Sequence, residues 1–341
     1  MRGGMRLLGR IDLMVRLLVL AILLASVLPA TGGAREIAQW ISNAAIFVLF
    51  FLNGLRLPRH EVIRGIGHWR LLLPLVIWCF GAMALLGKGL ELALVDALPP
   101  LVALGFLYLG VLPSTVQSAT AYSSLAGGNV ASSVVAAALT NILGVFICAP
   151  LLAALGGGGA ADMGLDGLFK IFAILILPFA IGQWLQTRLS GWVADNRHLI
   201  TWMDRLSIAI AVYVAFSGAV EQGLWTRVGL GQWAVLLGGV CFMLALAFAG
   251  SWSLAKVVRL DRADRIAFLF AGAHKSIAMG APLAAVLFPP QVAGMVLLPL
   301  LVYHLMQLVV SAPLASRLAR PLRPVPGDGA CSEPTTIARD R

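Results

Sequence analysis

The chain has 341 residues, of which 60% are hydrophobic and only 12% are charged, and its formal net charge is +10. Soluble domains are about half apolar and about a quarter charged, so this composition excludes a soluble protein and indicates a polytopic membrane protein. The basic excess does not point to nucleic acid, because the Lys and Arg residues lie at the ends of apolar segments and in short loops.

Ten apolar segments approach the roughly 20 residues that cross the hydrocarbon core as a helix. The predicted transmembrane helices are 13–30, 37–57, 70–87, 99–126, 129–154, 167–188, 206–221, 231–257, 265–288 and 291–313. The first segment follows several arginines and resembles a secretory signal, but we expect it to be retained, because the repeat described below needs it. We expect residues 1–12 to be a cytoplasmic N-terminus and residues 314–341 to be a disordered cytoplasmic tail.

The basic residues predict the orientation of the chain. If the ten segments alternate, most of the 25 Lys and Arg residues fall on the side that holds both termini. Positive charge marks the cytoplasmic side, so both termini are expected there.

The chain divides into two halves of five segments, residues 13–155 and 156–313. An odd number of spans inserts the second half upside down, so the halves are expected to be inverted repeats. Cys148-Ala149-Pro150-Leu151 near the end of the fifth segment resembles Ser311-Ala312-Pro313-Leu314 near the end of the tenth.

The fourth segment is interrupted around Gly110 and Pro113, and polar residues follow the interruption. Helix ends inside a membrane expose backbone groups that lipid cannot satisfy, so they line a cavity or are capped by neighbours. Hydroxyl and amide oxygens here suit Na⁺ or a polar substrate group, and capping of the broken ends is the alternative interpretation. The candidates are Ser114, Thr115, Gln117, Ser118 and Thr120.

The ninth segment carries Lys275, with His274 and Ser276 beside it, between nearby glycines and Pro282. A charge at that depth is costly and usually faces a partner, a cavity or a pathway. Three interpretations stay open: a fixed ammonium that replaces a bound cation, a titrating group that carries a transported proton, and a structural plug bonded to helix-end carbonyls. His274 is a second candidate for titration near neutral pH.

The fifth and tenth segments add further polar candidates. Ser133, Thr140 and Asn141 share a helical face, and His304 occupies the place that matches Asn141 in the repeat, with Gln307 one turn on. Packing of small residues and structural hydrogen bonding are the alternatives.

At these residues the chain resembles the bile acid:sodium symporter family, and most closely its bacterial Na⁺-dependent transporter branch, which is related to the divergent vertebrate member seven. The matching stretches are Phe50-Phe51-Leu52-Asn53-Gly54-Leu55-Arg56-Leu57, Leu112-Pro113-Ser114-Thr115-Val116-Gln117-Ser118-Ala119, Gly127-Gly128-Asn129-Val130-Ala131, His274-Lys275-Ser276 and Leu298-Pro299-Leu300. The resemblance implies an all-α fold of two inverted five-helix repeats. It also implies that helices four and nine are broken and cross, and that a core domain moves against a panel domain.

The resemblance also implies sodium ligands at the crossing, but only Ser118 and Ser133 match, so a Na⁺ site near them is the remaining candidate. Phe270 and His274 stand where a Glu and a Gln ligand are expected. Lys275 can supply the missing positive charge, which argues against two-sodium coupling and against bile acid as the substrate.

We therefore expect a secondary transporter of a small organic anion in the bacterial inner (plasma) membrane, working by alternating access. No cofactor or resident metal is expected, and Na⁺ or H⁺ is the possible coupling ion. Two alternatives stay open: a non-transporting membrane regulator with a locked core, and an intramembrane enzyme, which we do not favour because no set of nucleophile, base and orienting group is visible.

Overall fold

The computed structural model describes residues 13–56, 68–156 and 172–319, and the regular structure within them is helical. The first half contains α2 (Leu13–Val27), α3 (Gly33–Arg56), α5 (Trp69–Ile77), the π-helical turn η1 (Trp78–Ala82), α6 (Met83–Leu94), α7 (Pro100–Val111), α8 (Val116–Leu125) and α9 (Val130–Gly156). The second half contains η2 (Phe172–Ile176), α11 (Leu177–Asp195), α12 (Arg197–Glu221), α13 (Leu224–Arg227), α14 (Leu230–Val257), α15 (Arg262–Ala273), α16 (Ile277–Leu287) and α17 (Pro290–Leu318). The predicted N-terminal segment 1–12 and the tail beyond residue 319 lie outside the described residues.

The described helices make this a multi-pass membrane protein. Eight helical segments are long and apolar enough to cross a membrane, or nine if the bent pair α7 and α8 forms one span. Helix α2 is shorter, with 15 residues, so the count of ten spans stays a prediction.

Several predicted helix ends were wrong. Helix α12 begins at Arg197 rather than near residue 206, α6 continues to Leu94 rather than residue 87, and α11 continues to Asp195 rather than residue 188. Helix α17 continues to Leu318, so the first residues of the predicted tail, 314–318, are helical. In each case the helix includes polar or charged residues beyond the apolar stretch that the prediction had followed.

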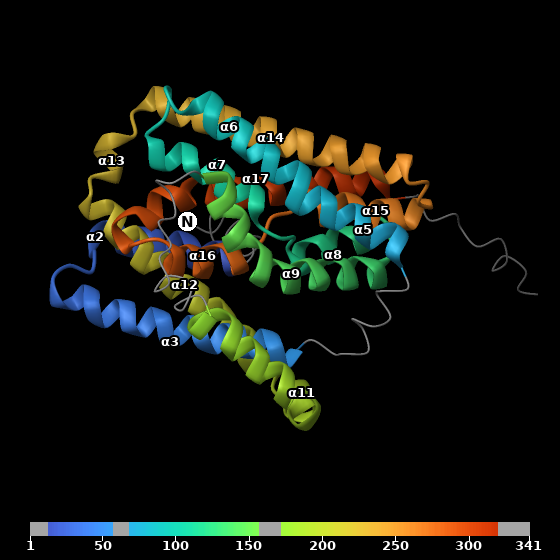
Figure 1. The fold of residues 1–341 in the computed structure, drawn as a ribbon, viewed down its shortest axis with the longest axis horizontal. Coiled ribbons are helices and arrows are strands. Elements are labelled where there is room, and N and C mark those ends of the chain that lie inside the picture. Colours follow the sequence, from blue (N-terminus) through green and yellow to red (C-terminus); the bar gives the residue numbers. More distant parts are fainter. Residues whose placement is uncertain (1–12, 57–67, 157–171, 320–341) are drawn as a thin grey trace, which may run out of the picture.

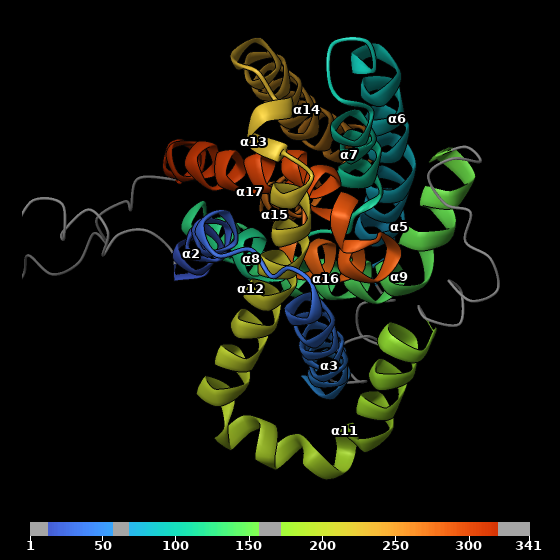
Figure 2. The same cartoon turned by 90° about the vertical axis from the view of Figure 1, so that its left-hand side faces the viewer.

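The helices form two groups (Figures 1 and 2). The panel group consists of α2, α3, α11 and α12, in which α3 packs on α11 and α12, and α2 packs on α12. The core group consists of α5 to α9 and α14 to α17. Figure 2 shows α3 and α11 projecting away from the core group. Helix α12 joins the groups, because it also packs on α16 and α17.

Two ion pairs fasten α3 to α12 within the panel group. Arg35 at the start of α3 pairs with Glu221 at the end of α12, and Arg56 at the end of α3 pairs with Asp204 near the start of α12. The two helices are therefore antiparallel and are held together near both ends.

Both predicted breaks are present. Pro113 has no N–H to donate, and the preceding Leu112 is extended (φ −74°, ψ 149°), so α7 ends and α8 leaves at an angle of 61°. At the second break His274 and Ser276 are extended, and Ser276 Oγ caps α16 by accepting from Met279 N at 3.2 Å. Pro282 lies inside α16 and does not cause this break.

Candidate functional site

The two breaks meet and bond to each other in the core group. Ser276 N donates to Pro113 O at 3.0 Å, and Thr115 Oγ1 donates to Lys275 O at 2.7 Å. Helix-end groups that no lipid could satisfy are therefore satisfied by the opposite break.

Helix α17 clamps the second break from the side. Gln307 accepts from Lys275 N at 2.9 Å and donates to Lys275 O at 3.2 Å, so one side chain holds both backbone groups of this residue. Tyr303 donates its hydroxyl to Ala273 O at 2.7 Å. The unwound stretch is thus fixed in one conformation.

The Lys275 side chain is completely buried and turns toward the carboxyl end of α7. Its ammonium donates to Leu112 O at 2.7 Å, to Gly110 O at 2.9 Å and to Cys79 O at 3.3 Å. A helix carboxyl end carries partial negative charge, which favours a cation. This arrangement agrees with two of the three interpretations, a fixed ammonium in a cation's place and a plug on helix-end carbonyls.

His274 is also fully buried and bridges two hydroxyls. Its Nδ1 lies 2.8 Å from Ser118 Oγ, and its Nε2 lies 2.7 Å from Ser311 Oγ. The edges of nearby aromatic rings, those of Phe248 and Phe270 among them, surround the imidazole. His274 therefore links α8 to α17 through hydrogen bonds to both sides of its ring.

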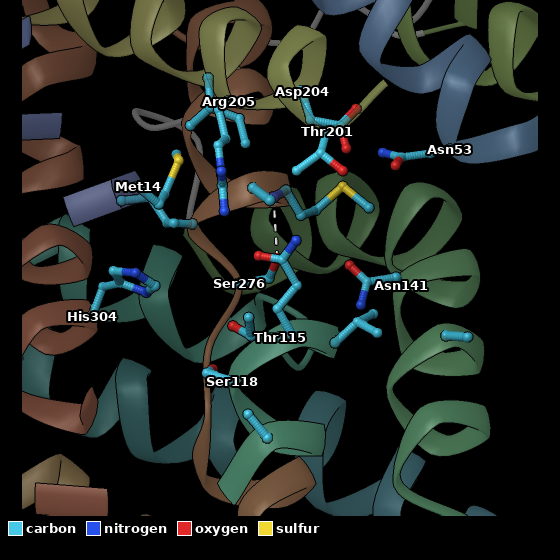
Figure 3. A pocket seen from close by; sticks show the side chains of 18 of the residues that line it. Met14, Asn53, Thr115, Ser118, Asn141, Thr201, Asp204, Arg205, Ser276 and His304 are labelled. Carbon is cyan, nitrogen blue, oxygen red and sulfur yellow. Dashed lines mark hydrogen bonds between the residues drawn. The ribbon is translucent and has the colours of Figure 1, made fainter. Parts of the chain in front are cut away.

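A cavity of about 1010 Å³ lies between the core and panel groups. Figure 3 shows its two walls, with Asn53, Asp204 and Arg205 from the panel group facing Thr115, Asn141 and Ser276 from the core group. Most of the remaining lining is apolar, for example Phe50, Val145, Ile208, Leu305 and Leu308.

The amino ends of two half-helices open on this cavity. Val116 and Gln117 of α8, and Ile277 and Ala278 of α16, lie at the first turns of their helices and line it. The first N–H groups of a helix lack intrahelical partners and carry partial positive charge. The cavity is therefore electrically suited to an anionic group.

The charged side chains at one end of the cavity favour an anion as well. Asp204 pairs with Arg56, and Arg205 also lines the cavity. Arg205 Nε is buried and makes no hydrogen bond within the part of the chain that the structure describes. Two guanidinium groups against one carboxylate leave a positive balance.

The predicted site residues divide into those that line the cavity and those that lie behind it. The cavity-lining residues are Thr115, Gln117, Ser118, Asn141, Ser276 and His304. The remaining candidates, which do not line it, are Ser114, Thr120, Ser133, Thr140, His274, Lys275 and Gln307.

Several of the residues behind the cavity hold the site together. Ser123 Oγ donates to Ser133 Oγ at 3.2 Å, and Thr140 Oγ1 donates to Ala137 O of its own helix at 3.0 Å. The Asn141 amide, which does reach the cavity, donates to Ser114 O at 2.7 Å and so ties α9 to the first break.

The sequence did not predict the panel wall of the cavity, which is formed in part by Asn53, Arg56, Thr201, Asp204 and Arg205. Helix α12 begins earlier than predicted, so Asp204 and Arg205 lie within the helix and not in the loop before it. Asn53 stood in one of the stretches that carried the family resemblance, and this was the available signal.

Comparisons with known proteins identify the family of the chain. The family model for the SBF-like CPA transporter family matches residues 12–320. "Uncharacterized protein PA2026" of Pseudomonas aeruginosa is 41% identical over 308 residues, which cover 89% of this chain and 91% of that protein. "Putative symporter YfeH" of Escherichia coli (strain K12) is 39% identical, covering 93% and 95% of the two chains. "Sodium/bile acid cotransporter 7" of Rattus norvegicus is 24% identical, covering 83% and 84%.

Proposed function

The chain belongs to the SBF-like CPA transporter family, and we propose that it is a secondary transporter that carries a small organic anion across the bacterial inner membrane by alternating access. The observation that carries the proposal is the cavity between the core and panel groups, on which the amino ends of α8 and α16 both open.

The substrate is an amphipathic anion. Its charged group binds at the two helix amino ends, where Gln117 adds an amide and Ser276 a hydroxyl. Its apolar body contacts the aliphatic and aromatic lining, since ligand sites combine mostly apolar walls with a few polar groups that fix orientation. Arg205 attracts the anion from the panel side.

The two halves of the chain act as inverted repeats. In the repeat, α2 corresponds to α11 and α3 corresponds to α12. Helix α3 packs on α11, and correspondingly α12 packs on α2. The helix that follows each broken pair contributes a polar residue to the cavity, Asn141 from α9 after α7 and α8, and His304 from α17 after α15 and α16. Two related halves around a central site provide the symmetry that alternating access uses.

The cavity faces the cytoplasm. Besides residues at the breaks it is lined by Met14, Arg56, Thr201 and Arg205, which lie toward helix ends that we expect on the cytoplasmic side from the distribution of basic residues. On the other side α12 packs closely on α17, where Gly218 approaches Pro290. We therefore propose that this conformation is an inward-facing state of the transport cycle.

A non-transporting regulator with a locked core is the second candidate, because the hydrogen bonds across the breaks are well satisfied. A regulator does not need to release what it binds on the opposite side of the membrane. The two functions therefore differ in counterflow, the exchange of a labelled ligand against an unlabelled one across a bilayer.

The test combines binding with counterflow. Purified full-length protein is screened for thermal stabilisation by aryl and alkyl carboxylates and sulfonates, each paired with its uncharged amide. We expect anions with apolar bodies to raise the melting temperature and their amides not to do so. The best anion is then labelled and should exchange in proteoliposomes. Stabilisation without exchange would favour the regulator, and preference for the amides would contradict an anion site.

A further inference from the structure

We propose that the carbonyl oxygens around the Lys275 ammonium form a site for a monovalent cation, and that this ammonium occupies it permanently. The inference rests on the proposed transport function only for its consequence, which is that the crossing of the breaks operates without a bound sodium ion. The site itself is argued from the contacts of Lys275.

Three backbone oxygens converge on one positive charge. Leu112 O, Gly110 O and Cys79 O accept from the ammonium at 2.7, 2.9 and 3.3 Å. Unwound backbone carbonyls and the carboxyl ends of half-helices are the groups that coordinate Na⁺ inside transporters. Here Gly110 and Leu112 lie at the carboxyl end of α7, where the helix dipole is negative.

The third oxygen, Cys79 O, comes from the irregular turn between α5 and α6, in the segment that precedes the broken pair α7 and α8. Cys79 lies in the π-helical turn η1, and the adjacent Trp78 donates its indole N–H to Gly272 O at 3.1 Å. The turn thus contacts the second break at two points, through Trp78 and through Cys79. Single π-helical turns often mark functional sites.

The ammonium is held in place by its own backbone. Gln307 binds both the N–H and the carbonyl of Lys275, and Thr115 binds the same carbonyl. Since the side chain is also completely buried, it has little freedom to move away from the three oxygens. The lysine therefore acts as a tethered ligand of the carbonyls.

Removal of the ammonium deprives these carbonyls of a buried, charged donor, which is unfavourable. A small monovalent cation satisfies them, because it carries the same charge and binds oxygen. Ser114, two residues after Leu112 in the same break, has a buried Oγ that makes no hydrogen bond among the described residues.

The experiment compares melting temperatures of the full-length protein in detergent in NaCl, KCl and choline chloride at equal ionic strength. The variants are Lys275→Ala and Lys275→Gln, and the control is Lys88→Ala, which removes a lysine that pairs with Glu91 away from the breaks. For the wild type, and likewise for Lys88→Ala, we expect the melting temperature to be independent of which of the three salts is present. Lys275→Ala should gain a saturable rise of about 3 °C or more in Na⁺ or K⁺ over choline.

Two results would overturn the inference. One is a saturable sodium-specific rise in the wild type, which would reveal a free sodium site; this arm needs no variant. The other is a Lys275→Ala protein that is less stable and indifferent to the cation, as a plain plug predicts. If Lys275→Ala does not fold, Lys275→Gln decides by the same readout. The assay contains no organic anion, so its failure leaves the transport proposal standing.

Discussion

Arg205 lines the cavity and is expected to contribute to its selectivity for an anion. A hydrogen bond to a charged group contributes about 1.5–3 kcal/mol, which corresponds to roughly tenfold to a hundredfold in affinity. We therefore expect Arg205→Gln to weaken binding of the best anion from the screen by tenfold or more, measured by calorimetry. Arg188→Gln removes an exposed guanidinium that stacks on Trp184 outside the cavity and should leave affinity unchanged. Equal affinities in the two variants would show that Arg205 does not contact the anion.

Tyr303 tests how strongly α17 holds the second break. Its buried hydroxyl donates to Ala273 O at 2.7 Å, at the end of α15. Tyr303→Phe leaves that carbonyl without this donor and should lower stability by about 2 kcal/mol. Tyr213→Phe is the matched control, because its hydroxyl also bonds to a backbone carbonyl, Leu28 O, but in an exposed position. Thermal unfolding of both variants should show a clearly larger loss for Tyr303→Phe, and similar losses would contradict the clamp.

Between elements, the crossing of α12 and α17 depends on a residue without a side chain. A Cβ on Gly218 would lie 2.0 Å from Pro290 O, so Gly218→Ala has to push the two helices apart. Overpacking of this kind costs about 1–3 kcal/mol. Gly238→Ala in α14 meets no atom within 4 Å and should be neutral or slightly stabilising, because alanine favours helix. A difference in melting temperature between the two variants checks this close approach, and equal melting would contradict it.

The breaks also show how much of the site could be predicted from the sequence. Pro113 and the charge of Lys275 each conflict with a continuous apolar helix, so both interruptions were visible from local chemistry. The direction of the Lys275 side chain was not, since it depends on α7 and η1 being placed next to the second break by packing. Ser118 and Asn141 could be predicted as site residues, because they are polar residues in apolar segments. Asp204 and Arg205 could not, because the first turns of α12 are polar and do not stand out as part of an apolar helix.

At the scale of the whole molecule, the cavity lies between two helix groups that we expect to move relative to each other. The Arg35–Glu221 and Arg56–Asp204 pairs hold α3 and α12 together, so we expect the panel group to move as a unit against the core group. Movement that opens the crossing of α12 and α17 would close the cavity at its Arg205 end. This movement would therefore change the side of the membrane from which an anion bound between the two groups can be reached.

The inward-facing orientation can be tested with single cysteines in a cysteine-free background. Ala121 of α8 lines the cavity, and Ala97 is exposed in the turn between α6 and α7, which the alternation of spans places outside the cytoplasm. A membrane-impermeant maleimide should label Ala121→Cys in inside-out vesicles but not in intact spheroplasts, because in the proposed orientation the cavity opens to the cytoplasm. Ala97→Cys should show the opposite pattern and so controls for the sidedness of both preparations. The anion that stabilises the protein should slow labelling of Ala121→Cys alone. Labelling of Ala121→Cys from the outer side only would show that the cavity faces away from the cytoplasm. If the labelling pattern of Ala97→Cys were reversed as well, the orientation proposed for the whole chain would be wrong.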